Sequence, residues 1–386
     1  MNAPAEQFMD AYTSVYNGAG FPTDPAGPIY VQDGSTVFAS CTVSNYREAL
    51  RNEAAEPGSV MLQRSFRTRT LDQLHLDAHP NRRALFDMYG GFESATESDA
   101  SEKILLHGGL MQTTLEECGV DTPDIAVMAD RTDWTRWDVN TSAARFNAHA
   151  YPDTPTDNPL PKRAGKIVKE YGEGILGHGV EVFVRSQSGE WGLAGNVVET
   201  ICPDDMTSGI DYGGGLEATV MAVHGPEAAY LDAEMCERFQ LSSKTNNPRL
   251  LNLLEALEAL MIMHTHEHER HPLSVTNSAA AYAARAILLQ THHLGVSDEE
   301  LRTLGGYHTD HVLVSPNAAA AALEEVALRK NAIQNFMVRT AKSVVAKKIS
   351  LRRQQASRQG HSFDKSHEAK LIIEQSHKLP ADVWQV

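Results

Sequence analysis

The spacing of apolar residues predicts a helix at the N-terminus, followed by strands. Residues 5–20 carry apolar side chains at helical spacing and end in a Gly-rich stop, which is typical of an amphipathic helix. Apolar and polar residues then alternate over 29–44 around the turn Asp33-Gly34, which predicts strands. Residues 45–52 favour a short helix.

The stretch Met61–Phe92 predicts an antiparallel hairpin. An alternating apolar segment ends in Phe66-Arg67, a polar loop with Arg and His follows, and an apolar segment returns at 84–88. Arginine offers a planar fork of donors for phosphate or carboxylate, and an aromatic residue on the returning strand offers a face for a base. From the pattern alone, a surface hairpin with solvated arginines is the more frequent case.

Further elements predict an α+β fold, with an antiparallel sheet flanked by helices. A helix is expected over 104–118, and strands over 125–128, 180–184 and 195–201. Residues 131–160 have a weak pattern with several prolines and are interpreted as an insertion or lid. A strand that breaks at three glycines and enters a helix is predicted at 211–224, and glycines there permit close approach of a ligand.

From about Gly225 onward the pattern is helical. Asn247-Pro248 is a cap with Pro at the first helical position, and helices are predicted over 249–270, 279–289, 318–330 and 334–348. We therefore expect two domains, an α+β domain at 1–230 and an all-α domain at 231–386.

Composition is that of an ordinary globular protein. The 386 residues are 42% hydrophobic and 22% charged, with neither a membrane-span-length apolar run nor a basic, apolar leader. A cytoplasmic protein is therefore expected. The four cysteines are widely spaced, so neither a disulfide framework nor a cysteine-ligated metal site is predicted.

The net charge of −16 argues against general affinity for nucleic acid. Between Arg329 and Lys370, however, eleven basic residues are opposed only by Asp364 and Glu368. A phosphate backbone could bind this segment, although a solvated basic helix face is an equally good interpretation.

Histidines cluster in the sequence His264–His271. On a helix His264 and His268 would share a face, which suits a metal. The adjacent Glu267 and Glu269 instead favour an exposed polar helix end, so no metal site is predicted.

Several stretches together resemble the class II aminoacyl-tRNA synthetases, and the alanyl enzymes most. Arg67, its loop and Phe86–Phe92 resemble motif 2. Three others resemble further conserved stretches in order and spacing, and the tail 378–383 does so faintly: Asp33–Phe38, Gly174–Phe183, and Ile210–Glu217, the last being similar to motif 3. The resemblance implies a class II-like sheet followed by a helical domain.

The resemblance implies nucleotide-side roles for part of the hairpin. Arg67 would hold a carboxylate or phosphate oxygen at the acyl-transfer centre, and Phe86 would stack on the adenine of ATP or of a tRNA terminus. Arg82 or Arg83 could replace a loop base near the terminal phosphate. The remaining nucleotide-side residues are Met88, Gly213, Gly215 and Glu181, the last of which could contact adenylate or metal.

On the amino-acid side, the resemblance implies that Asp211 pairs with the α-ammonium group. Asn196 is a second contact, and Val43 stands where the family has a small-pocket methionine. A small acyl group such as alanyl is therefore expected.

Departures from the family concern ATP. Ala218 stands where motif 3 has the arginine that holds the far end of the triphosphate, and one lost charge-assisted contact removes about 1.5–3 kcal/mol. The Lys of the motif 2 loop and the Arg-rich tRNA-reading helix have no counterpart, and the editing domain is missing.

Three functions remain open. The first is transfer of an aminoacyl group, most simply L-alanyl from alanyl-tRNA, to a small, possibly nucleoside-like acceptor in specialised metabolism. The second is ATP- and Mg²⁺-dependent formation of an aminoacyl-adenylate, with transfer to a small molecule, carrier protein or tRNA. The third is a non-catalytic binding or regulatory module. Whether the protein is a monomer or a homodimer stays open.

Overall fold

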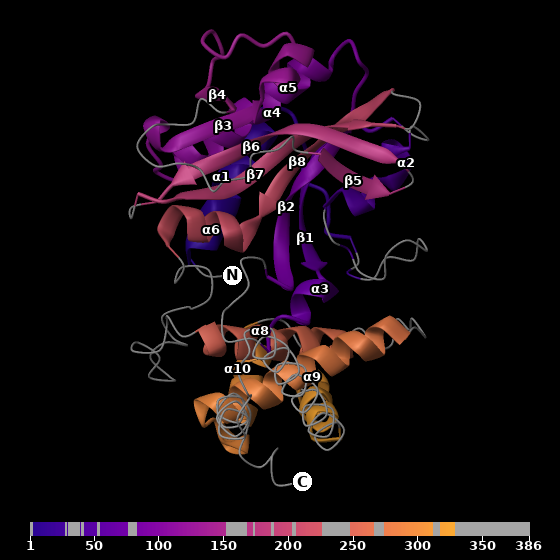
Figure 1. Ribbon diagram of the computed structural model, residues 1–386, viewed down its shortest axis with the longest axis vertical. Coiled ribbons are helices and arrows are strands. Elements are labelled where there is room, and N and C mark those ends of the chain that lie inside the picture. Colours follow the sequence, from indigo (N-terminus) through magenta and orange to yellow (C-terminus); the bar gives the residue numbers. More distant parts are fainter. Residues whose placement is uncertain are drawn as a thin grey trace, which may run out of the picture. The chain divides into compact units, whose positions relative to one another are not determined.

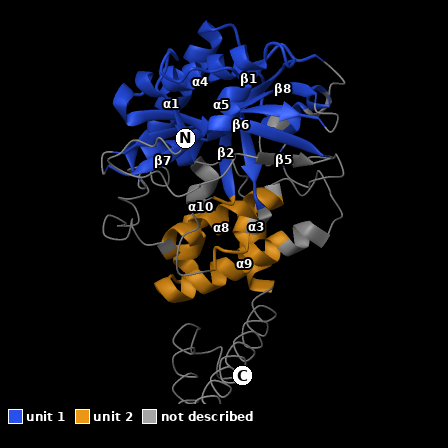
Figure 2. Ribbon diagram, turned by 45° about the horizontal axis from the view of Figure 1, so that its top comes forward, with its two compact units in different colours: residues 1–67, 85–246 blue, residues 68–84, 247–386 orange. Residues whose placement is uncertain are grey.

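The chain divides into two compact units (Figure 2). The computed structural model describes residues 3–27, 29, 39, 42–51, 55–75, 83–151, 168–172, 174–186, 189–202, 206–225, 248–265, 274–311 and 317–328. Unit 1 comprises Met1–Arg67 and Leu85–Asn246, and unit 2 comprises Thr68–Ala84 and Asn247–Val386. The domain boundary predicted at 230 lies outside the described residues. The assignment of Thr68–Ala84 to unit 2 was not anticipated.

Unit 1 is built on one eight-stranded sheet (Figure 1). The strand order is β1-β2-β8-β7-β6-β3-β4, with β5 also paired to β6. Every pair is antiparallel except β3 with β4. The bounds are β1 Ser59–Phe66, β2 Leu85–Ser94, β3 Ile125–Asp130, β4 Ala148–Tyr151, β5 Val168–Gly172, β6 Ile175–Arg185, β7 Trp191–Ile201 and β8 Thr207–Gly215. The predicted mixed, largely antiparallel architecture is confirmed.

The helices of unit 1 agree closely with the apolar periodicity. The described helical elements are α1 Ala3–Gly18, η1 Thr42–Asn45, α2 Arg47–Leu50, α4 Ala100–Glu117, η2 Thr122–Asp124, α5 Arg131–Arg136 and α6 Leu216–His224. The N-terminal helix, the helix at 104–118 and the strand-to-helix transition at 211–224 are thereby confirmed.

One face of the sheet packs against α1, α4 and α6 and forms the main core (Figure 1). Alternate residues of the central strands point to this face, among them Tyr89 of β2, Val197 of β7 and Tyr212 of β8, all fully buried. Near β1 and β2 the opposite face is covered by η1 and α2. That opposite face carries the predicted site residues and is called the site face below.

Two sequence predictions are wrong in detail. Residues 42–44 were expected in a strand but belong to the 3₁₀ turn η1, which lies against β2 and buries Thr42. Residues 131–151 were interpreted as an insertion, yet they contain α5 and β4. Four-residue β4 is held by parallel pairing with β3, a non-local contact that a sequence pattern cannot show.

The described residues of unit 2 are helices and turns. The helices are α3 Thr68–Leu71, α8 Pro248–Thr265, α9 Ser274–Leu294, α10 Asp298–His311 and residues 317–328. Pro248 begins α8 as predicted. The helix expected at 334–348, the basic segment 329–370 and most of the His cluster lie outside the described residues, so the all-α domain stays a prediction. No described helix is both long and apolar enough to cross a membrane.

Candidate functional site

Arg67 and Phe86 meet at the end of the β1–β2 hairpin. The register pairs Ser65 with Phe86 and Phe66 with Leu85, so Arg67 follows the last pair of the ladder. Its guanidinium carbon lies 4.2 Å from the centroid of the Phe86 ring, within the range of a cation–π contact. The structure therefore brings together the two residues that the sequence placed on either side of the loop.

The neighbouring Arg64 has a different environment. It donates to both carboxylate oxygens of Asp87, at 2.5 and 3.1 Å. Because successive strand residues alternate between faces, this pair lies opposite the Phe86 side chain. Arg64 is thus a strand-to-strand tie, and Arg67 is the arginine on the site face.

A single row of paired residues crosses the site face. Gly90 of β2 pairs with Gly213 of β8, Gly213 with Asn196 of β7, and Asn196 with Glu181 of β6. Directly paired residues point to the same face, and neighbouring strands lie about 4.8 Å apart. The row therefore brings together three predicted site residues, namely Gly213, Asn196 and Glu181.

Asp211 lies on the same face, two residues before Gly213 along β8. It is 7% exposed and pairs with Phe92 of β2. Since Phe86 and Phe92 are six residues apart on β2, Asp211 and the Arg67–Phe86 pair are separated by about 20 Å along the strand. The two groups can therefore bind opposite ends of one extended ligand rather than the same functional group.

The centre of the row carries no side chain. Gly213 has φ +143, and a Cβ there would lie 2.1 Å from the Tyr89 carbonyl oxygen and 2.6 Å from Gly90 Cα. The backbones of β2 and β8 thus approach each other too closely for any residue but glycine. Bare backbone forms the surface between Asn196 and Met61, the partner of Gly90 on β1.

The turn η1 covers this bare backbone. Thr42 is fully buried, and its hydroxyl would lie 2.9 Å from a Cβ built on Gly90. Val43 is the next residue of the turn, so its backbone lies near the predicted amino-acid side of the site, while its side chain lies outside what the structure describes. Thr42 was missed because nothing in its sequence context marks it.

Phe86 has two small neighbours from the strand-to-helix transition. A Cβ on Gly215 would lie 3.6 Å from both the Phe86 ring and the Ala218 side chain, and Gly215 pairs with Met88. Ala218 is exposed. Gly215 thus has both the Phe86 ring and the methyl of Ala218 as neighbours, and Ala218 stands where the resemblance would place an arginine.

The adjacent Glu217 joins α6 to β2. Its carboxylate accepts the backbone N–H of Asp87 at 3.0 and 3.2 Å. This contact holds the strand that carries Phe86 and Met88 against the helix that follows the glycines.

Tyr151 was missed by the sequence analysis. Its hydroxyl donates to Glu181 at 3.1 Å, so it orients one carboxylate of the row. It belongs to β4, the strand that the sequence pattern did not reveal.

Of the two loop arginines, Arg82 and Arg83, the structure describes Arg83. Arg83 belongs to unit 2, where its Nη2 lies 3.3 Å from Glu258 and its Nε lies 3.9 Å from Glu255. Arg82 lies outside the described residues. A phosphate-binding role for either arginine stays a prediction.

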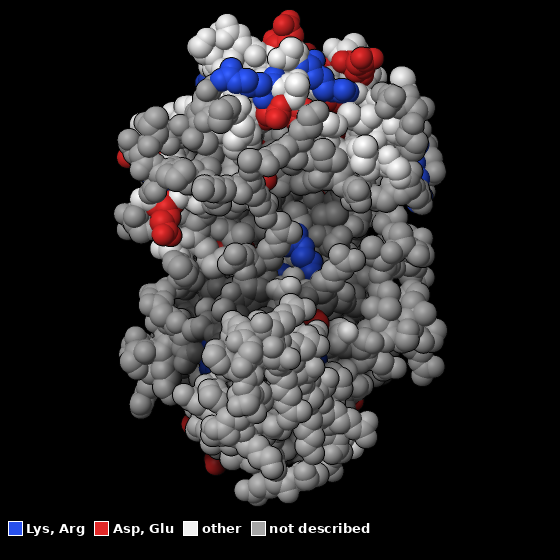
Figure 3. All heavy atoms as spheres, viewed as in Figure 1, with Lys and Arg blue, Asp and Glu red and all other residues white. Residues whose placement is uncertain are grey.

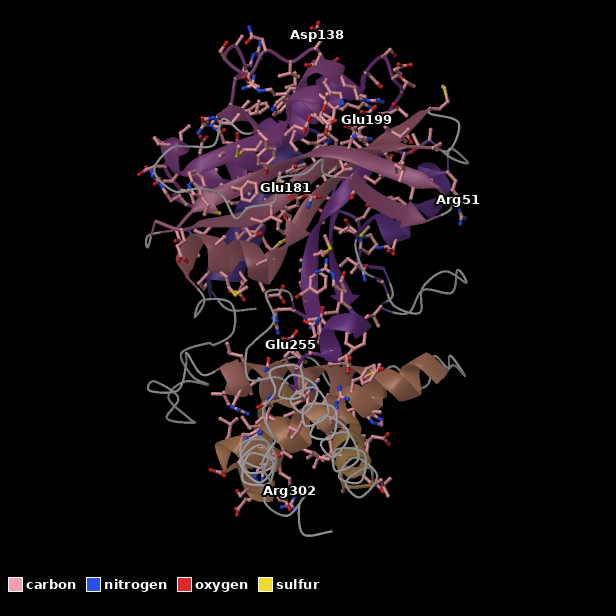
Figure 4. All side chains as sticks on the ribbon, in the orientation of Figure 1. Arg51, Asp138, Glu181, Glu199, Glu255 and Arg302 are labelled. Atoms are coloured by element: carbon pink, nitrogen blue, oxygen red, sulfur yellow. The ribbon has the colours of Figure 1, made fainter. Side chains whose placement is uncertain are left out.

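Glu199 is a buried carboxylate with a structural environment (Figure 4). Glu199 belongs to β7, the strand next to the one that carries Glu181, but it points to the other face of the sheet. There Arg136, Trp137 and Thr207 donate to it at 2.7–3.1 Å. Burial by itself raises the pKa of Glu199, but these donors outweigh it and lower the pKa below its usual value. All its donors come from the protein, which marks Glu199 as part of the framework.

The described surface carries both signs of charge. Figure 3 shows Lys and Arg side chains beside Asp and Glu side chains over α5. Among the described residues no group of three or more His, Cys, Asp or Glu could hold a metal ion.

The chain was compared with known proteins. No protein-family model matches it, and no curated protein matches it. Among solved structures it is similar to PylSc of Desulfitobacterium hafniense, a pyrrolysyl-tRNA synthetase, with 11% identity over 58% of this chain and 72% of that chain and a TM-score of 0.33. It is also similar to apo histidyl-tRNA synthetase of S. aureus, with 9% identity over 64% of this chain and 75% of that chain and a TM-score of 0.34. The assignment of a function therefore depends on the residues of the site.

Proposed function

We propose that the protein is an aminoacyltransferase that takes an aminoacyl group, L-alanyl in the simplest case, from aminoacyl-tRNA and passes it to a small acceptor. The observation that carries the proposal is the Arg67–Phe86 pair at the hairpin end, on the same face as Asp211 and Asn196. This arrangement offers a cation and an aromatic ring at one end and a buried carboxylate at the other, which complements adenosine joined to an amino acid.

Binding of the terminal adenosine would release Arg67. A cation–π contact is worth about 0.5–1 kcal/mol when exposed and about 2 kcal/mol when desolvated, and Phe86 is only 4% exposed. A base stacked on an aromatic ring is worth about 1–3 kcal/mol, so a base would have to displace the guanidinium from Phe86 against a contact of comparable strength. At that end Arg67 is placed to pair with a phosphate oxygen beside the terminal adenosine rather than with the ester carbonyl, because the carbonyl adjoins the α-ammonium group that Asp211 would bind about 20 Å along β2.

The remaining residues orient the acyl group. Asp211 pairs with the α-ammonium group and Asn196 bonds the same end. The acceptor nitrogen or oxygen forms a bond to the carbonyl carbon, the ester C–O bond breaks, and the proton passes to the departing ribose oxygen. No external energy source is required, because the ester is already activated.

Ala218 and Arg83 favour this reaction over ATP activation. The methyl of Ala218 cannot bind a terminal phosphate, and Arg83 lies against the carboxylates of Glu258 and Glu255. The ATP- and Mg²⁺-dependent alternative retains support from Glu181, whose carboxylate lies in the row and could contact a metal. Amino-acid-dependent exchange of pyrophosphate into ATP would support that alternative, and its absence together with transfer from alanyl-tRNA would support the proposal.

The decisive variant is Arg67→Ala. The probe is 5′-O-(N-alanylsulfamoyl)adenosine, a stable alanyl-adenosine analogue, with binding measured by calorimetry. Loss of one charge-assisted contact should weaken binding by about 1.5–3 kcal/mol, roughly ten- to a hundredfold.

Arg185→Ala is the matched control, because Arg185 also lies over an aromatic ring, Trp191, at 5.6 Å. It should leave the affinity unchanged. If the probe does not bind, or if both variants bind it equally, the site assignment is wrong. If binding depends on Arg67 but no acyl transfer from alanyl-tRNA occurs, the protein is a binding module.

A further inference from the structure

The segment Thr68–Ala84 joins Arg67 to the strand of Phe86, yet it packs within unit 2. Its first turn, α3, lies against α9. Leu71 and Leu74 are fully buried, which removes their apolar side chains from water. The described residues at the beginning of the segment are therefore packed as part of unit 2.

Two side chains of α9 hold the beginning of this segment. Gln290 donates to the backbone carbonyl of Leu74 at 2.9 Å, and Gln290 is fully buried. Arg285 pairs with the Asp72 carboxylate and donates to the Asp72 carbonyl at 3.2 Å. These bonds hold backbone atoms directly, which fixes the path of the chain and not only its side chains.

A carboxylate of α8 holds the end of the segment. Glu255, 1% exposed, accepts the backbone N–H of Ala84 (Figure 4 labels Glu255). The adjacent Arg83 contacts Glu258 at 3.3 Å. Hydrogen bonds to an ionised group are roughly twice as strong as neutral ones, and a buried backbone N–H that loses its acceptor carries the full desolvation cost.

Both attachments lie next to the candidate site in the chain. Arg67 directly precedes Thr68, and Phe86 follows Ala84 by two residues, which at 3.8 Å per Cα step is about 8 Å. Arg67 and Phe86, which are in contact at 4.2 Å, are therefore each close in the chain to one of these attachments.

We propose that Glu255, with Arg285 and Gln290, is a positioning residue of the candidate site: by holding the two ends of Thr68–Ala84 it sets where Arg67 and Phe86 lie. It touches no ligand itself. The consequence for ligand affinity rests on the proposed function, whereas the placement of the two residues does not.

The test compares full-length Glu255→Ala with wild type by hydrogen–deuterium exchange and by binding of the alanylsulfamoyl adenosine probe. Circular dichroism first establishes that each variant is folded. In Glu255→Ala the amides of Leu85–Met88 should exchange about tenfold faster, because the strand end frays when its anchor is lost. Those of β6 and β7 should be unchanged, and the probe's Kd should rise about tenfold.

Two further variants make the outcome specific. Glu255→Gln keeps an acceptor for the Ala84 amide and should recover most of the protection, whereas the exposed Glu299→Ala on α10 should match wild type. Faster exchange across α8 and α9 with Leu85–Met88 unchanged would overturn the proposal, because it would show a purely structural role. If the wild type fails to bind the probe, the proposed function fails while the exchange data still decide the positioning.

Discussion

At the scale of single residues, two side chains of the same type can have different roles because their neighbours differ. Arg64 and Arg67 are three positions apart, but one ties β1 to β2 through Asp87 and the other lies over Phe86. Glu181 and Glu199 are both buried; Glu181 accepts a hydrogen bond from Tyr151, and Glu199 accepts from Arg136, Trp137 and Thr207, which lower its pKa. A carboxylate whose charge the fold already compensates has little left to offer a ligand.

His107 should make the stability of unit 1 depend on pH. It is fully buried, its Nε2 lies 2.8 Å from Glu93, and its ring stacks on Tyr212 at 3.7 Å. Burial lowers its pKa more than Glu93 raises it. In the unfolded chain His107 therefore binds a proton at about pH 6.5, whereas in the folded chain it does not. The stability that neutral His107 contributes is present above that pH and is lost as the pH falls below it.

The variant His107→Gln removes this titration. Urea denaturation between pH 7.5 and 5 should show a slope smaller than that of wild type by up to about 1.4 kcal/mol per pH unit. At pH 7.5 the variant should still be less stable, since the stacked ring is lost. An identical slope in both proteins would show that the pKa of His107 is the same in the folded and the unfolded chain, which contradicts the prediction.

At the scale of elements, the candidate site depends on the close approach of β2 and β8. The variant Gly213→Ala places a Cβ 2.1 Å from the Tyr89 carbonyl oxygen at φ +143. We expect a loss of about 3 kcal/mol in the free energy of unfolding, measured by denaturant titration.

Gly109→Ala provides the comparison. Gly109 lies within α4, and a Cβ there would meet only Phe146, at 3.7 Å. Alanine should stabilise the helix by about 0.5–1 kcal/mol. If Gly213→Ala is tolerated as well as Gly109→Ala, the two strands are not as close as described.

At the scale of the whole molecule, the chain changes unit three times. It enters unit 2 at Thr68, returns to unit 1 at Leu85 and enters unit 2 again at Asn247. A fragment of residues 1–246 would retain Thr68–Ala84 without the helices that bury Leu71 and Leu74. Such a fragment should bind a hydrophobic dye and aggregate, because two leucines worth about 1.5–3 kcal/mol each are exposed.

Replacing Thr68–Ala84 in that fragment by a short Gly-Ser turn should restore a monomer, as judged by size-exclusion chromatography. Equal behaviour of the two fragments would show that the segment does not require unit 2. The comparison therefore separates a domain boundary at one point of the chain from one that also passes through the hairpin.

The sequence by itself determined the elements whose signals are local. The amphipathic periodicity of 5–20, the alternation on both sides of the Arg67 loop, and the three glycines after Tyr212 each specify a helix, a hairpin or a strand break through neighbours within a few residues. The resemblance to class II synthetase motifs, rather than these local signals alone, named Arg67, Phe86, Asp211 and Asn196 as candidates.

Only the tertiary structure decided how those candidates are arranged. The pairing Gly90–Gly213–Asn196–Glu181 joins residues from four strands, and register between strands depends on packing across the sheet, which no local pattern encodes. The role of Tyr151 follows only from the parallel pairing of β4 with β3. The role of Glu255 follows only from its hydrogen bond to Ala84, 171 positions earlier in the chain. The local sequence therefore indicates which side chains could bind a ligand, whereas long-range pairing determines where those side chains lie.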